Sequence, residues 1–146
     1  MSALILQVED NEADARLTRE ALRERGDDVQ LCTVGDGEQA LLYLRRGAGY
    51  ESVIRPHLVL LDLNLPRKGG LEVLEELQAD PALNAIPVIV LTSSSAERDI
   101  DACYARGANA FVVKPQELDE FMDLIETIRS FWLEAARLPS ERWPNS

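Results

Sequence analysis

The stretch PHLVLLDLNLP, residues 56–66, decides the fold of this chain. Its run from Leu58 to Leu61 is wholly apolar and does not alternate with polar residues, which is typical of a strand covered by helices on both faces. The run stops at Asp62, a charged residue that a buried strand interior would not accommodate without a partner. We therefore expect a central strand of a parallel sheet with an acidic residue at its carboxyl end.

Three further apolar runs end on polar residues in the same way. They are Leu4 to Val8 followed by Glu9 and Asp10, Val88 to Leu91 followed by Thr92, and Phe111 to Val113 followed by Lys114. The carboxyl ends of parallel strands share one edge of a sheet, where open α/β sheets bind ligands. Carboxylates crowded at such an edge raise each other's pKa unless a cation joins them. The pattern predicts a divalent metal and phosphate chemistry.

Strand-like and helix-like segments alternate five times along the chain. The expected strands are 4–8, 29–34, 58–62, 88–91 and 110–113, and the expected helices are 12–25, 36–46, 71–79, 95–106 and 117–137. Asn11, Asp36 and Ser95 are candidate N-caps, and Gly107 can close its helix in a left-handed conformation. This alternation predicts βα units on a parallel sheet, and 146 residues fit one α/β domain.

Composition limits the partners and the compartment. Fifteen basic and 26 acidic side chains give a net charge of −11, which argues against nucleic acid or anionic lipid as the main partner. The first apolar stretch is too short for a signal peptide and no run is long enough to cross a membrane, so we expect a cytoplasmic protein. Cys32 and Cys103 are expected to be free thiols, and His57 to be structural or exposed.

The last expected helix carries more apolar residues than one face can bury. One stripe, expected to pack on the sheet, consists of Leu118, Phe121, Met122, Ile125, Ile128 and Trp132. A second row consists of Leu124, Phe131, Ala135 and Leu138, and Trp143 follows in the tail. The tail either folds back on its own domain or is disordered, or else this region, with Phe131, Trp132, Leu138 and Trp143, forms a homodimer interface, which is the interpretation we favour.

Taken together, Glu9-Asp10, Asp62, Thr92 and Lys114-Pro115, in this order on successive strand ends, resemble the receiver domain of two-component response regulators. The resemblance covers residues 1–130 and leaves 131–146 as a helical extension and tail. It implies a doubly wound, flavodoxin-like five-stranded sheet in the order 2-1-3-4-5, with helices on both faces and an extended last helix. The strings VEDNEADARL, PHLVLLDLNLP and FWLEAARLPS are similar to single-domain regulators paired with phytochrome histidine kinases.

The resemblance implies that Asp62 accepts a phosphoryl group from a phosphohistidine of a sensor kinase. Mg²⁺ would be held by Asp10, Asp62 and the backbone carbonyl of Asn64, with Glu9 acting through water, and Lys114 would pair with the phosphoryl oxygens. With no DNA-binding or catalytic domain appended, the output would be altered protein association.

The resemblance also implies a switch. Thr92 would hydrogen-bond the phosphoryl oxygen, Phe111 would rotate into the space that Thr92 leaves, and the Lys114-Pro115 bond would be cis. Phe111 stands where the family more often has Tyr. Taken alone, each residue also has an ordinary interpretation: Asp62 as a strand-end acid, Thr92 as a turn cap and Phe111 as core.

Two other functions remain open. A phosphohydrolase of the haloacid dehalogenase type also uses a strand-end Asp with a Thr or Ser, a Lys and Mg²⁺. Such an enzyme needs a second Asp two residues later, where this chain has Asn64. A receiver-fold binding module that is never phosphorylated is the other alternative, against which the intact set of site residues argues.

Overall fold

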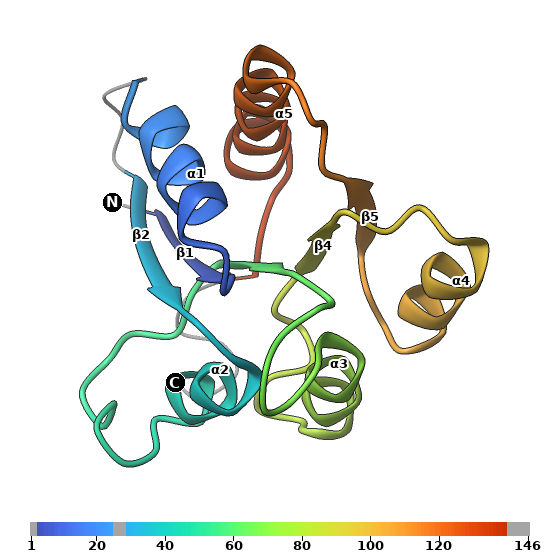
Figure 1. The fold of residues 1–146 in the computed structure, drawn as a ribbon. Coiled ribbons are helices and arrows are strands. Elements are labelled where there is room, and N and C mark those ends of the chain that lie inside the picture. The colour runs from blue at the N-terminus through green and yellow to red at the C-terminus, as the bar shows by residue number, and fades with distance from the viewer. Residues whose placement is uncertain (1–2, 25–28, 140–146) are drawn as a thin grey trace.

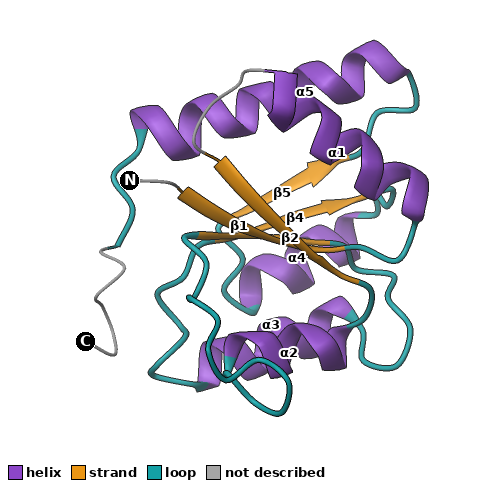
Figure 2. Ribbon diagram, turned by 90° about the vertical axis from the view of Figure 1, so that its left-hand side faces the viewer, coloured by secondary structure: helices purple, strands orange, loops and turns teal. Residues whose placement is uncertain are grey.

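The structure is a computed structural model of the chain, and residues 3–24 and 29–139 are described. Parallel strands form one sheet in the order β2-β1-β3-β4-β5, as expected, with helices on both of its faces (Figures 1 and 2). The strands are β1 (Ala3–Val8), β2 (Val29–Val34), β3 (Leu58–Leu61), β4 (Val88–Thr92) and β5 (Ala110–Val113). The helices are α1 (Glu12–Glu24), α2 (Gly37–Leu44), α3 (Gly70–Ala79), α4 (Glu97–Ala105) and α5 (Leu118–Ser130).

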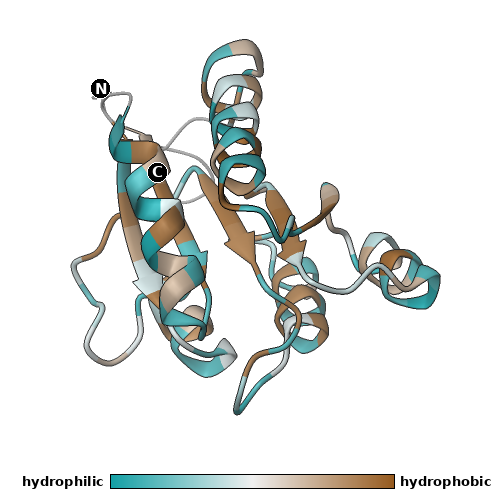
Figure 3. Cartoon of the chain, turned by 45° about the horizontal axis from the view of Figure 1, so that its top comes forward, coloured by the Kyte–Doolittle hydropathy of each residue, from teal (hydrophilic) through white to brown (hydrophobic). Residues whose placement is uncertain are grey.

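Strand β3 is apolar throughout because helices cover both of its faces. Leu58 and Leu60 belong to a cluster with α1 and α5, whereas Val59 and Leu61 belong to a cluster with α2, α3 and Cys103 of α4. All four residues are buried. Figure 3 shows hydrophobic central strands flanked by helices along which hydrophilic and hydrophobic residues are mixed. The absence of alternation in the sequence therefore identified a two-sided core correctly.

The helix ends follow the sequence signals with one exception. The side chain of Asp36 accepts a hydrogen bond from the amide of Gln39 at 2.8 Å, and Gly107 adopts a φ of 94° after α4. The expectation that Ser95 caps α4 is wrong, because the helix begins at Glu97. Ser94 instead accepts the amide of Ala96 at 3.3 Å, which satisfies a backbone donor just before the helix.

The last helix differs from the expected 117–137. Regular α5 ends at Ser130, and a π-helical turn, Phe131–Ala135, continues it. A π turn inserts one extra residue per turn, and here the neighbours Trp132 and Leu133 both pack against the cluster of α1 and α5. The buried Arg129 bonds Glu134 at 2.8 Å and so ties this turn to α5.

Two residues of this helix were assigned to the wrong face. Leu118 begins α5 and is 56% exposed, so it does not join the stripe that packs on the sheet. Leu124, expected in the outer row, packs against the cluster of α1 and α5. Of the remaining stripe residues, Phe121, Ile125 and Ile128 are buried, and Met122 and Trp132 are partly buried and pack against the same cluster, as expected.

Three isolated residues take structural roles. His57 accepts a hydrogen bond from the amide of Leu4 on Nδ1 at 3.0 Å, which ties the start of β3 to β1. Cys32 and Cys103 are free thiols, as expected.

In the part of the chain that the structure describes, no helix is long and apolar enough to cross a membrane.

The glycine at the start of α3 allows this helix to approach the end of β3. A Cβ on Gly70 would lie 2.6 Å from the carbonyl oxygen of Asp62, whereas a Cβ on Gly35 would meet no heavy atom within 4 Å. We expect Gly70→Ala to lower the free energy of unfolding by about 1–3 kcal/mol through this steric conflict. Urea unfolding measures the change. The control Gly35→Ala should leave stability unchanged or slightly raised, and equal effects of both substitutions would contradict the prediction.

Candidate functional site

The site lies at the carboxyl edge of the sheet, where backbone hydrogen bonds between neighbouring strands fix its residues. The amide of Glu9 donates to Val34 at 2.9 Å and the amide of Asp62 donates to Val8 at 3.1 Å. The amide of Lys114 donates to the carbonyl of Thr92 at 2.8 Å. Each side chain therefore starts from a strand end whose position the sheet determines, as the sequence predicted.

Three carboxylates meet at this edge. Glu9, Asp10 and Asp62 each offer an oxygen, and these oxygens lie within 4.8 Å of one another. Glu9 and Asp62 are buried, whereas Asp10 is exposed. A small cluster of hard oxygen donors with one open side fits a divalent cation that keeps several water ligands. The structure thus brings together the side chains that the sequence proposed as metal ligands.

The protonation of these acids reflects burial and the nearby lysine. Burial raises the pKa of Glu9 to about 7, although Lys114 acts in the opposite direction. Burial also tends to raise the pKa of Asp62, but the Lys114 ammonium, together with hydrogen bonding from the Asn64 amide and the Thr92 hydroxyl, holds the pKa below its usual value. Asp62 is therefore an ionised carboxylate at neutral pH, which is the form that acts as a nucleophile.

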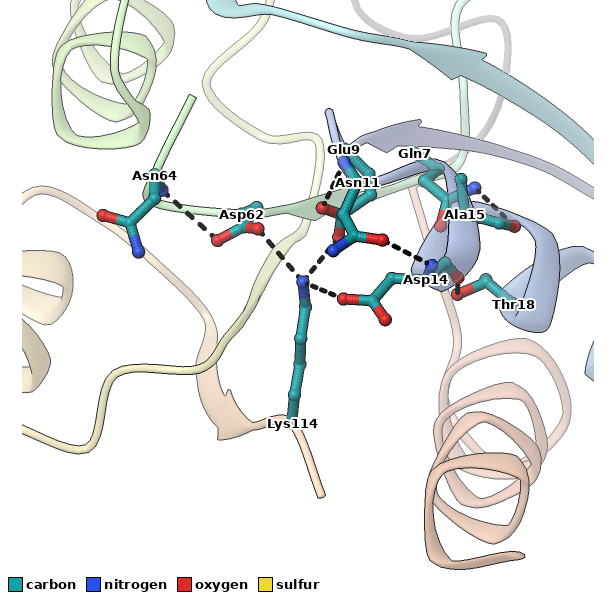
Figure 4. Close-up of polar contacts among 9 residues, drawn as sticks. All are labelled: Gln7, Glu9, Asn11, Asp14, Ala15, Thr18, Asp62, Asn64 and Lys114. Carbon is teal, nitrogen blue, oxygen red and sulfur yellow. Dashed lines mark hydrogen bonds and ion pairs between the residues drawn. The ribbon is translucent and has the colours of Figure 1, made fainter. Parts of the chain in front are cut away.

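Lys114 is the cation that joins this cluster (Figure 4). Its Nζ lies 2.8 Å from Glu9, 2.9 Å from Asp14 and 3.1 Å from Asp62. Burial alone would lower the pKa of Lys114, but the hydrogen bonds to Asp14 and Glu9 raise it above its usual value. The ammonium is thus charged and placed directly beside the Asp62 carboxylate.

Asp14 is a site residue that the sequence analysis missed. It was placed only in the first turn of the first helix, where acidic residues are common for reasons of the helix dipole alone. The structure turns this first turn toward Lys114 (Figure 4). The one signal that could have revealed it is position, because a helix that follows β1 directly must begin at the same sheet edge as Glu9 and Asp10.

Thr92 ends β4 with a fully buried hydroxyl. That hydroxyl lies near enough to Asp62 to help hold the carboxylate ionised, yet no hydrogen bond of normal geometry satisfies it among the residues described. An unpaired buried hydroxyl is uncommon and calls for a ligand, a water or an ion. Its place at the sheet edge is the one expected for a group that binds a phosphoryl oxygen.

Phe111 is half-buried and packs against the cluster of α2, α3 and α4. Its amide donates to the hydroxyl of Tyr104 on α4 at 3.0 Å. Tyr104 is 50% exposed, so a tyrosine hydroxyl is present on this surface although Phe111 itself has none.

The predicted interface residues lie apart from the acidic cluster, in the π turn and beyond it. Phe131 is 53% exposed and meets Trp132 edge-to-face with ring centroids 5.3 Å apart. Leu138 is half-buried, and Trp143 lies outside the described residues. The described part of the chain therefore presents one exposed aromatic ring here, with its neighbour partly covered.

Comparison with known proteins agrees with this fold. The model of the response regulator receiver domain matches residues 5–126. The response regulator Rcp1 of Synechocystis is 43% identical over 94% of this chain and 93% of its own length. Among solved structures, the phosphorylated cyanobacterial phytochrome response regulator RcpA has a TM-score of 0.93 at 44% identity, covering 96% of this chain and 100% of that one.

The Mn²⁺-bound form of Rcp1 superposes with a TM-score of 0.90 at 43% identity, covering 94% of this chain and 99% of that one. These similarities extend over almost the whole of each relative, so they are not confined to a fragment of the fold. The chain belongs to the family of response regulator receiver domains.

Proposed function

We propose that Asp62 accepts a phosphoryl group from a phosphohistidine of a sensor histidine kinase. The observation that carries this proposal is the contact between the ionised Asp62 carboxylate and the Lys114 ammonium, 3.1 Å apart, within a cluster of metal-binding acids. A hollow of about 640 Å³, lined by Glu9, Asp10, Arg16 and Arg19 among others, opens beside the cluster and leaves room for a partner's side chain.

In the proposed transfer an Asp62 oxygen attacks the phosphorus, the phosphorus–nitrogen bond breaks, and the imidazole leaves with the electron pair. Lys114 binds the phosphoryl oxygens and balances their charge. Asp10, Asp62, the carbonyl of Asn64 and, through water, Glu9 would hold Mg²⁺. When bound, the ion offsets the repulsion between carboxylate and phosphoryl oxygens.

The proposed response couples the phosphoryl group to the surface of α4 and β5. The unpaired Thr92 hydroxyl would bind a phosphoryl oxygen, and Phe111 would move into the space that Thr92 leaves. Phe111 adjoins α4, because its backbone amide donates to the Tyr104 hydroxyl, so a rotation of the Phe111 ring would change the surface beside α4. A cis bond between Lys114 and Pro115 belongs to the same proposal. The protein would then act by altered association rather than by turnover of a substrate.

We further propose a phytochrome-type kinase as the partner and the cytoplasm as the compartment. RcpA is described as a phytochrome response regulator, and the likeness to it covers nearly the whole chain. The free thiols of Cys32 and Cys103 agree with a reducing compartment.

A phosphohydrolase is less well supported. The amide of Asn64 donates to Asp62 at 3.3 Å, but its side chain is an amide and does not supply the general acid and base that such an enzyme needs. A binding module that is never phosphorylated has no use for a buried lysine held beside three carboxylates.

Substitution of Asp62 tests the phosphoacceptor. We expect Asp62→Asn to abolish labelling by acetyl phosphate or by a phosphorylated histidine kinase in the presence of Mg²⁺, because the nucleophilic carboxylate is lost. The label is followed on protein bands and assigned to an acyl phosphate by its release with hydroxylamine. The matched control Asp101→Asn changes an exposed acid of α4 and should be labelled like the wild type. Undiminished labelling of Asp62→Asn would refute the assignment.

Substitution of Asp10 tests the metal site. We expect Asp10→Asn to weaken Mg²⁺ binding by about tenfold or more, since a direct carboxylate ligand is lost. Stability should change little because Asp10 is exposed. Titration calorimetry measures the affinity, and Glu12→Gln, a nearby exposed acid outside the cluster, serves as the control. Equal affinities of Asp10→Asn and the wild type would exclude Asp10 as a ligand.

We also propose a homodimer formed through α4, β5, α5 and the π turn, with Phe131, Trp132, Leu138 and Trp143 in the interface. The exposed ring of Phe131 supports it, because exposed aromatic rings are enriched at association surfaces. We expect light scattering to give a dimer mass for the wild type and a monomer mass for Phe131→Ala. Ile54→Ala, at a similarly exposed apolar residue in the loop before β3 and outside the proposed interface, should remain dimeric. A monomeric wild type at micromolar concentration would disprove the dimer.

A further inference from the structure

Asp14 contacts the phosphoryl-binding lysine without belonging to the acidic cluster. Its Oδ2 lies 2.9 Å from Lys114 Nζ, within the range of a charge-assisted hydrogen bond. The three cluster acids are Glu9, Asp10 and Asp62, and Asp14 is not among them. Lys114 therefore has one carboxylate partner that is neither the phosphoacceptor nor a candidate metal ligand.

The backbone of Asp14 is fixed by the helix that carries it. The side chain of Asn11 accepts the amide of Asp14 at 3.0 Å, and the carbonyl of Asp14 accepts the hydroxyl of Thr18 at 3.0 Å. The Asp14 side chain is 26% exposed, and the Lys114 side chain that it contacts is 7% exposed. Asp14 thus approaches Lys114 from a rigid first turn of α1 and forms the solvent-facing side of the ammonium's surroundings.

The other two partners of Lys114 have competing roles. Metal ligation draws on the oxygens of Glu9 and Asp62, and phosphorylation converts Asp62 into an acyl phosphate. An ammonium has three donors, so it can bind the phosphoryl group and still keep the contact with Asp14. Asp14 is the partner whose carboxylate no other step of the proposed function requires.

We propose that Asp14 is a positioning residue that holds the Lys114 ammonium over the Asp62 carboxylate throughout the phosphorylation cycle. This inference rests on the proposed function of Asp62 as phosphoacceptor. A lysine side chain is long and flexible, and its strongly hydrated head turns to water where nothing holds it. Without Asp14, the ammonium would spend part of its time in solvent and bind the phosphoryl group less tightly.

Beryllofluoride, which forms an acyl-phosphate-like adduct with a carboxylate, tests the proposal in the presence of Mg²⁺. We expect Asp14→Ala to weaken beryllofluoride binding by about three- to tenfold, the size of one partly exposed contact to a charged group. Asp14→Asn keeps a hydrogen-bond acceptor at the same place and should restore most of the affinity. Asp119→Ala, an exposed acid in the first turn of α5, should bind like the wild type.

A second substitution, Lys114→Ala, distinguishes a positioning role of Asp14 from a general structural role. If Asp14 acts through Lys114, adding Asp14→Ala to Lys114→Ala should cause no further loss of beryllofluoride affinity. Mg²⁺ affinity in the absence of beryllofluoride should change less than about twofold in Asp14→Ala, because Asp14 is not a ligand.

Three results would overturn the positioning role. The first is that Asp14→Ala binds beryllofluoride with wild-type affinity. The second is that Asp14→Ala binds it more tightly, which would show that Asp14 competes with the phosphoryl group. The third is that Asp14→Ala loses the same beryllofluoride affinity whether or not Lys114 is present. A wild-type protein that forms no adduct would instead refute Asp62 as the phosphoacceptor, and this inference with it.

Discussion

The Lys114 ammonium is the interaction on which the rest of the site depends. Four acidic side chains converge where three strands and the first turn of α1 meet, and without a cation they would repel one another or take up protons. Lys114 contacts three of them at 2.8 to 3.1 Å and lowers the pKa of Asp62, while burial raises the pKa of Glu9 to about 7. In the proposed function, a divalent ion and a phosphoryl group share Glu9 and Asp62 with Lys114, so the lysine takes part in any rearrangement of the site.

The sheet fixes the distances between these charged side chains. Glu9, Asp62 and Lys114 are each held by a backbone hydrogen bond to the adjacent strand, so their Cα positions are as rigid as the core. Gly70 lets α3 begin directly against the Asp62 carbonyl, where any side chain would push the helix away. The packing of the sheet and of α3 therefore determines the spacing of the charges.

The sequence was sufficient for those features that local patterns determine. The unbroken apolar runs predicted buried parallel strands, and their polar ends predicted the cluster of Glu9, Asp10 and Asp62. Asp14 was missed because an acid in a first helical turn has an ordinary explanation, and only the angle of α1 against the sheet turns it to Lys114. The end of the last helix was missed because a π turn depends on the packing of Trp132 and Leu133 and on the bond from Arg129 to Glu134. Ser94 rather than Ser95 meets the amide before α4, since neighbouring serines give the same sequence signal.

On the proposal that Asp62 is phosphorylated, the unpaired Thr92 hydroxyl offers a way for the phosphoryl group to favour a second conformation. A buried polar group without a partner costs about 1–3 kcal/mol, and this cost is present only while no acceptor is available. A phosphoryl oxygen on the neighbouring strand end would supply that acceptor and remove the cost. Each tenfold change in the ratio of the two conformations requires about 1.4 kcal/mol. Recovering the cost at Thr92 therefore shifts this ratio by roughly five- to hundredfold. The hydrogen bond from the Phe111 amide to the Tyr104 hydroxyl joins β5 to α4, the two elements that the proposal assigns to the response.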